Sequence, residues 1–157
     1  MIKFKDSNFL TVPNHPEIKV GVGQTIPNGG VFTVSGDTTV VPLATDKELF
    51  IAVNVIDKPD LKNTNDFQLK AGDFAKAYRM KDLVGLKFDM DATLVSDAYS
   101  TITVGETLVP DGTKWKVGTI ATGGVGFEVY EKNTFGMFTT YKGTDVAGGL
   151  GVKVVLA

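Results

Sequence analysis

The sequence contains no cysteine among its 157 residues and only one histidine. The absence of cysteine excludes disulfide scaffolds, cysteine nucleophiles and thiolate metal sites. The single histidine, His15, lies between Pro13 and Pro16, and no G-x-S-x-G motif occurs anywhere in the chain. A histidine-assisted nucleophile is therefore not expected, because such a base must lie within hydrogen-bond reach of its partner.

Long apolar runs and arginine are also scarce. No run approaches the ~20 apolar residues that span a bilayer, so a membrane is not an expected partner. The net charge is −2 and Arg79 is the only arginine, whereas arginine is the usual residue for bidentate phosphate and guanine contacts. Nucleic acid is therefore not an expected partner either. Residues 1–6 lack the apolar core of a secretory signal, which predicts synthesis and retention in the cytoplasm.

What the chain does contain is typical of β-structure. It has 20 Val and 18 Thr against 11 Leu and 5 Glu, and β-branched residues suit a pleated sheet. Short alternating runs are separated by glycine turns at intervals of about 8–15 residues, a spacing typical of small barrels and sandwiches. We predict an all-β fold, a small β-barrel or β-sandwich with an extended N-terminal arm and at most one short helix. Residues 74–80 fit either a helix or a strand face.

The polar stretch between residues 57 and 66 suggests a division of the chain. We predict an N-terminal arm and β-containing lobe at 1–57, a polar loop or linker at 58–66, and a β-barrel domain at 67–157.

The first 16 residues contain two closely spaced prolines, which favour extended chain over helix. A solvated tail rarely needs large apolar side chains, yet this segment has four. We predict that these residues dock on a partner: Ile2, Phe4, Phe9 and Leu10.

Candidates for catalysis and cofactor binding are weak. Asp89 and Asp91 would share one face of a strand, but no second ligand cluster accompanies them, so we expect solvated surface carboxylates. The glycines at 21–24 and 123–126 lack the remainder of a dinucleotide or phosphate-loop motif and indicate hairpins. We therefore predict no catalytic residue, no cofactor and no metal, and a protein that is not an enzyme.

Several turn-and-strand motifs resemble those of the small β-barrel head decoration proteins of tailed bacteriophages. The resemblance extends from about residue 67 to the end of the chain, and residues 1–60 have no part in it. The motifs are AGDFAKAY (71–78), DLVG (82–85), VGETLVPDGTKW (104–115), FEVYEKNTF (127–135) and GVKVV (151–155).

The resemblance implies a virion structural protein that is made in the host cytoplasm and binds the outer surface of the phage capsid. Its implied partners are the major capsid protein and further copies of itself, such as a trimer. It also favours a strand at residues 74–80. Deletion of residues 1–11 is then expected to weaken capsid binding while the barrel still folds.

An alternative is a carbohydrate- or receptor-binding β-domain of a phage head or tail fibre. That function requires an exposed aromatic platform, for which the candidates are Trp115, Tyr130 and Tyr141. Burial of Trp115 in the core beside Val117 is the expectation that we favour. A metal-dependent enzyme using Asp89 and Asp91 is the remaining, weakest alternative.

Overall fold

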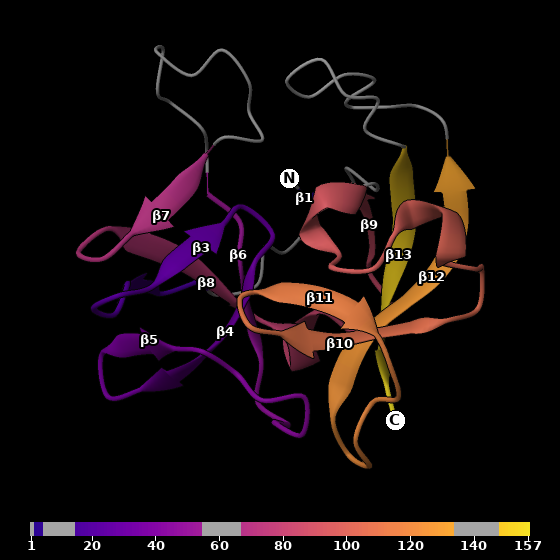
Figure 1. The fold of residues 1–157 in the computed structure, drawn as a ribbon. Coiled ribbons are helices and arrows are strands. Elements are labelled where there is room, and N and C mark those ends of the chain that lie inside the picture. Colours follow the sequence, from indigo (N-terminus) through magenta and orange to yellow (C-terminus); the bar gives the residue numbers. More distant parts are fainter. Residues whose placement is uncertain (1, 5–14, 55–66, 134–147) are drawn as a thin grey trace.

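The computed structural model describes residues 2–4, 15–54, 67–133 and 148–157. In Figure 1, a barrel and a larger sheet lie side by side. The predicted all-β fold is confirmed, because strands dominate and the described residues contain no α-helix. The sequence predicts at most one short helix, whereas the part of the chain that the structure describes contains three single-turn 3-10 helices: η2 (Met80–Leu83), η3 (Ala92–Leu94) and η4 (Tyr99–Thr101).

The barrel is closed by five short strands in the order β2-β5-β4-β6-β8. Gly36, with φ of 59°, forms the tight turn between β4 and β5, where a residue with a β-carbon would be strained. A two-stranded sheet of β3 (Thr25–Pro27) and β7 (Gln68–Lys70) accompanies the barrel. The barrel strands are β2 (Glu17–Lys19), β4 (Val31–Ser35), β5 (Thr38–Val40), β6 (Phe50–Ala52) and β8 (Phe74–Arg79).

The second body is a six-stranded antiparallel sheet in the order β1-β9-β13-β12-β10-β11. The longest pairing joins β12 to β13, and its register shifts between Val129 and Glu131 at a bulge. The strands are β1 (Ile2–Phe4), β9 (Lys87–Asp91), β10 (Thr107–Asp111), β11 (Lys114–Val117), β12 (Val125–Asn133) and β13 (Gly149–Leu156).

Strand pairing corrects the predicted position of the barrel. The closed barrel comprises strands between residues 17 and 79, whereas the sequence predicts a barrel at 67–157. Two sets of long-range pairings explain the difference. Strand β8 pairs with β2 and β6 and so closes the barrel in the first half of the chain, and β1 pairs with β9 and so joins the six-stranded sheet. Neither long-range pairing leaves a local signal in the sequence. The linker predicted at 58–66 lies outside the described residues, so a domain division there stays a prediction.

Residues 74–79 form a strand, which is the alternative that the resemblance favours. The alternation along β8 explains why the helical pattern fails. Ala75 and Ala77 are fully buried on one face, and Tyr78 lies in the core on the other.

The core extends from the barrel into the sheet. On β4, Val31 belongs to the cluster that continues into the sheet, while the adjacent Phe32 belongs to a second, smaller cluster. On β6, Ile51 and Ala52 divide in the same way. These strands are thus buried on both faces, and one face of the barrel is covered by the sheet.

Gly29 marks the contact between the two bodies. The Trp115 indole Nε1 donates a hydrogen bond to the Gly29 carbonyl over 3.1 Å. A β-carbon at Gly29 would lie 2.7 Å from Leu94 Cδ1 and 2.8 Å from Ile2 Cβ, and φ at this residue is +94°. Only glycine allows both the conformation and the close approach.

Candidate functional site

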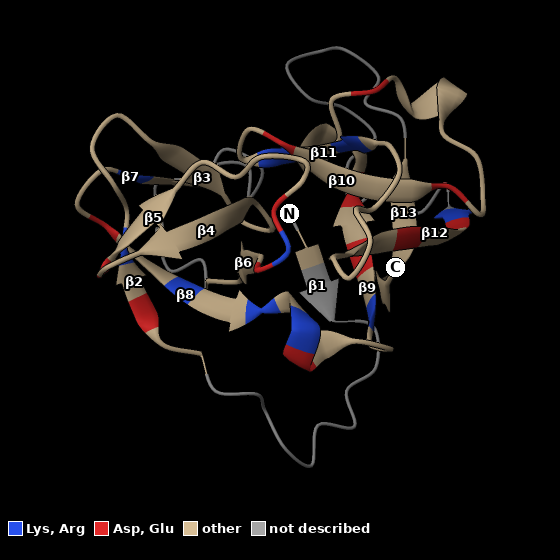
Figure 2. Ribbon diagram, turned by 90° about the horizontal axis from the view of Figure 1, so that it is seen from below, with Lys and Arg blue, Asp and Glu red and all other residues tan. Residues whose placement is uncertain are grey.

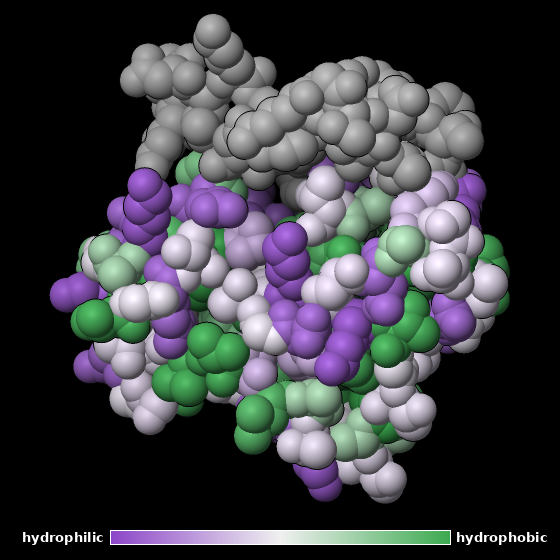
Figure 3. Space-filling view, viewed as in Figure 1, coloured by the Kyte–Doolittle hydropathy of each residue, from purple (hydrophilic) through white to green (hydrophobic). Residues whose placement is uncertain are grey.

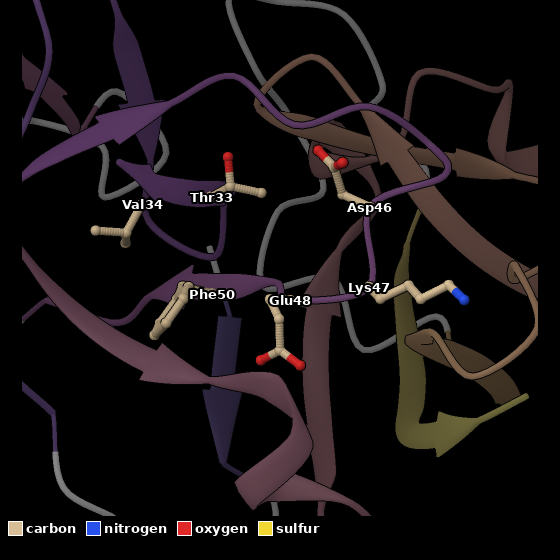
Figure 4. A pocket seen from close by; sticks show the side chains of 6 residues that line it. All are labelled: Thr33, Val34, Asp46, Lys47, Glu48 and Phe50. Carbon is tan, nitrogen blue, oxygen red and sulfur yellow. The ribbon is translucent and has the colours of Figure 1, made fainter. Parts of the chain in front are cut away.

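An open pocket lies where two barrel strands separate. Strands β4 and β6 are paired at only two positions, Val31 with Ile51 and Phe32 with Phe50. Beyond these pairs the chains diverge and leave a cavity of about 320 Å³. Figure 4 shows the side chains that line it: Thr33, Val34, Asp46, Lys47, Glu48 and Phe50.

The walls of this pocket combine an aromatic ring with oxygen acceptors. The half-buried Phe50 ring stacks on Phe32 with ring centroids 6.0 Å apart. The Asp46 carboxylate accepts a hydrogen bond of 2.8 Å from the Leu43 amide, which holds it at the mouth. In Figure 4 the Lys47 side chain extends away from the other lining residues, so its own ammonium group lies outside the cavity.

Glu48 is held by two cations that come from the end of β8 and from η2. Arg79 donates two hydrogen bonds to Glu48 Oε2, of 2.8 and 3.0 Å, and Lys81 binds Oε1. The hydrogen bond from Lys81, followed by that from Arg79, lowers the pKa of Glu48 below its usual value. Arg79 also lies 3.5 Å from Asp82. The only arginine in the sequence is thus part of an intramolecular ion network.

Basic residues outnumber acidic ones along β8 and η2, where Lys76, Arg79 and Lys81 are followed by Asp82. Figure 2, which is seen from the end that carries the C-terminus, shows blue segments along β8 and both signs on η2, with acidic segments on neighbouring elements. No region of one sign dominates the described residues in this view, which agrees with the small net charge of −2.

An exposed apolar segment borders the pocket. Val40, Val41 and Leu43 have exposed fractions of 38%, 45% and 67%. Figure 3 shows hydrophobic surface over β5 and the segment that follows it. Because these residues precede Asp46 directly in the chain, apolar surface and pocket are adjacent.

The predicted capsid-interface residues have different positions. Ile2 is 2% exposed and packs in the core of its own chain, so it is not an exposed interface residue. Phe4 belongs to β1, whose backbone pairs with β9. Phe9 and Leu10 lie outside the described residues, and their role stays a prediction.

The aromatic platform of the alternative function loses its central residue. Trp115 is fully buried and packs edge-on against Phe127 with ring centroids 4.7 Å apart. The favoured core placement of Trp115 is therefore confirmed. Tyr130 is half-buried with Lys87 over its ring, and Tyr141 lies outside the described residues.

The two paired aspartates are not the solvated carboxylates that the sequence suggests. Asp91 is 1% exposed and accepts a hydrogen bond of 2.9 Å from the Thr93 amide, which caps η3. Asp89 is half-buried on β9. Within the described ranges, no group of three or more histidine, cysteine or acidic residues is arranged to hold a metal.

His15 has a structural contact that its sequence context does not reveal. Its ring stacks on Tyr78 with centroids 4.8 Å apart and an interplanar angle of 8°. Burial raises the pKa of the Tyr78 hydroxyl. The contact places His15 against the edge of the core.

Comparisons with known proteins give no relative. No family model, curated protein or solved structure matches the chain. Across the described residues, no helix is long and apolar enough to cross a membrane. A functional assignment therefore depends on the residues and geometry of this chain.

Sequence reasoning missed the pocket. Its polar residues come from two segments, Thr33 on β4 and the Asp46–Glu48 stretch before β6. The sequence feature that could have indicated the pocket is the charged triplet of residues 46–48 just before β6. Such a triplet looks like an ordinary surface turn. Only the separation of β4 from β6 brings the triplet opposite Thr33.

Proposed function

We propose that this chain is a capsid decoration protein of a tailed bacteriophage, which binds the outer surface of the head and stabilises the shell. The observation that carries the proposal is the uneven distribution of exposed apolar side chains. Among the described residues, the barrel half has five of the eight exposed large hydrophobic residues: Val22, Val40, Val41, Leu43 and Phe74.

Three of these five, Val40, Val41 and Leu43, come from one short segment, and exposed apolar residues that lie together mark a binding surface more often than scattered ones do. The other three, Val84, Val104 and Leu156, belong to the half that contains the sheet. The sequence motifs that resemble decoration proteins support the same function. Their best-defined part forms the β10–β11 hairpin, whose Trp115 fixes the barrel against the sheet.

A decoration protein stabilises the shell by mass action. A protein that contacts neighbouring capsid subunits binds the assembled shell and not the separated subunits. Its binding free energy therefore opposes their separation when packaged DNA pushes outward. Repetition over a symmetric lattice makes modest affinity at each site sufficient, more so for an oligomer.

The decisive experiment measures the chain in purified particles. Quantitative mass spectrometry of intact virions is expected to give a fixed ratio of this chain to the major capsid protein. An antibody against the chain is expected to label unopened heads. Absence from particles, or labelling confined to the tail tip, would reject the proposal.

A further inference from the structure

We propose that the pocket between β4 and β6 receives a lysine or arginine side chain of the capsid protein, and that Val41 and Leu43 cover the apolar residues beside it. The identity of the partner rests on the proposed function. The chemistry of the occupant rests on the pocket alone.

The polar groups of the pocket favour an occupant that donates hydrogen bonds. The Asp46 carboxylate only accepts hydrogen bonds, and its second oxygen remains after Oδ2 has accepted from Leu43. The Thr33 hydroxyl donates to the Val40 carbonyl at 3.4 Å, so its proton is not available to an occupant of the cavity. A sugar brings hydroxyls that both donate and accept, and it therefore needs donors from the protein. An ammonium or guanidinium group only donates and matches this set.

Of the two carboxylates that line the pocket, Asp46 is the one that forms no ion pair with a described residue. Glu48 is already bound by Arg79 and Lys81. Lys47 points out of the cavity, and its Nζ lies 3.9 Å from the position of a β-carbon at Gly123. A cation that enters the pocket thus gains a carboxylate that no described side chain neutralises.

The remaining walls suit the carbon chain of a basic residue. Val34 and the Phe50 ring line one side, and both are half-buried against the barrel core. Lysine and arginine bury their methylene groups on such surfaces, and a cation near an aromatic ring gains further stabilisation. The volume of about 320 Å³ is at the lower end for ligand cavities, as expected for one side chain.

The carboxylate and the apolar border belong to one turn. The Asp46 amide donates to the Leu43 carbonyl over 3.0 Å, and the Leu43 amide donates to Asp46 Oδ2 over 2.8 Å. This reciprocal pair fixes Leu43 beside the mouth of the pocket before any partner binds. A charged anchor bordered by apolar contacts is the usual anatomy of an interface hot spot.

The chemistry is tested on the isolated protein by NMR. N-acetyl-lysine methylamide is expected to shift the amide resonances of Thr33, Asp46 and Phe50, whereas the uncharged N-acetyl-norleucine methylamide is not. Equal shifts from both probes, or shifts from N-acetylglucosamine alone, would overturn the proposed occupant.

The partner is tested on phage heads stripped of this chain. Asp46→Asn keeps an acceptor for the Leu43 amide, so the turn is expected to persist while the charge is lost. Its affinity for heads is expected to fall roughly tenfold. Asp37→Asn, an exposed aspartate in the β4–β5 turn of the same barrel, serves as the matched control and is expected to bind like wild type.

Two failures are distinguishable. If wild type binds heads and Asp46→Asn binds equally well, the pocket is not the anchor and the inference is wrong. If wild type does not bind heads while the lysine probe still shifts the pocket resonances, the proposed function and its capsid occupant fall together. In that second case the preference of the pocket for a cation is upheld.

Discussion

The barrel and the six-stranded sheet differ in how they are held together. Strands β12 and β13 have nine and eight residues, whereas β2, β5 and β6 of the barrel have three each. The larger core cluster has 20 buried residues and lies mostly in the sheet, and the cluster confined to the barrel side has eight. Short strands give few ladder hydrogen bonds, so the barrel depends on the sheet that covers one of its faces. The rest of its surface carries most of the exposed apolar residues. We infer that the sheet supplies stability and the barrel supplies the binding surface.

The largest expected effect on stability comes from the centre of the sheet side. Trp115→Ala removes a fully buried ring and its hydrogen bond to Gly29, and we expect a loss of about 4 kcal/mol in the free energy of unfolding. Val104→Ala, on an exposed side chain of the same half, is expected to change it by less than about 0.5 kcal/mol. Urea denaturation measures both. A loss below about 1 kcal/mol for Trp115→Ala would contradict the role of Trp115 in joining the two bodies.

The contact between the bodies is tested by two glycines that share a positive φ. Gly29→Ala meets Leu94 and Ile2 as well as backbone strain, and we expect a loss of about 3 kcal/mol. Gly36→Ala meets no atom within 4 Å, so only the backbone strain of roughly 1–2 kcal/mol is expected. The difference between the two denaturation midpoints isolates the close packing. Equal losses would show that the barrel and sheet are not tightly packed at Gly29.

A smaller effect is expected from the ion network at the end of the barrel. Because the pKa of Glu48 is lowered in the folded state, its contribution is fully present above the ordinary glutamate value of 4.5 and is lost as pH falls through the lower folded value. The side chains of Glu48 and Arg79 are about half exposed to solvent. We therefore expect Glu48 to contribute less than about 1 kcal/mol to the free energy of unfolding. Urea midpoints of wild type and Glu48→Gln are expected to converge at acidic pH. A constant difference between them from pH 7 to pH 3 would exclude the proposed linkage.

The smallest effect on stability and the largest effect on binding to phage heads are both expected at Leu43. Leu43→Asp, at 67% exposure on the barrel, is expected to leave the unfolding free energy within about 0.5 kcal/mol and to abolish binding to heads. Val104→Asp, at 59% exposure on the sheet half, is the matched control and is expected to bind normally. Co-sedimentation with phage heads measures both. Loss of binding in both variants, or in Val104→Asp alone, would place the binding surface elsewhere.

Much of the local structure could be predicted from the sequence. The Val and Thr excess and the glycine turns predict the all-β fold, and burial of Trp115 follows from its size and setting. The position of the barrel could not be predicted, because it depends on pairings such as Lys19 with Phe74, which are 55 residues apart and lack a local pattern.

The N-terminal segment illustrates the same limit. The four apolar residues predict docking on a partner, but the pattern cannot identify the surface on which an apolar side chain is buried. Ile2 docks on its own chain, so deleting residues 1–11 removes a core residue and β1. Such a deletion is expected to destabilise the fold, contrary to the prediction that the barrel would fold unchanged.

The position of β9 has a consequence for the order of folding events. Its neighbours in the sheet are β1, which starts at residue 2, and β13, which ends at residue 156. Both ladders close large loops, whose entropy must be lost before the contacts form. We therefore expect folding to be slow for a chain of this size, in the range of milliseconds to seconds. Neither the barrel nor the sheet is expected to form a stable structure before the other. Cleavage of the chain between β8 and β9 would leave β1 on one fragment and β9 on the other. The two fragments are therefore expected to reassociate rather than to fold separately.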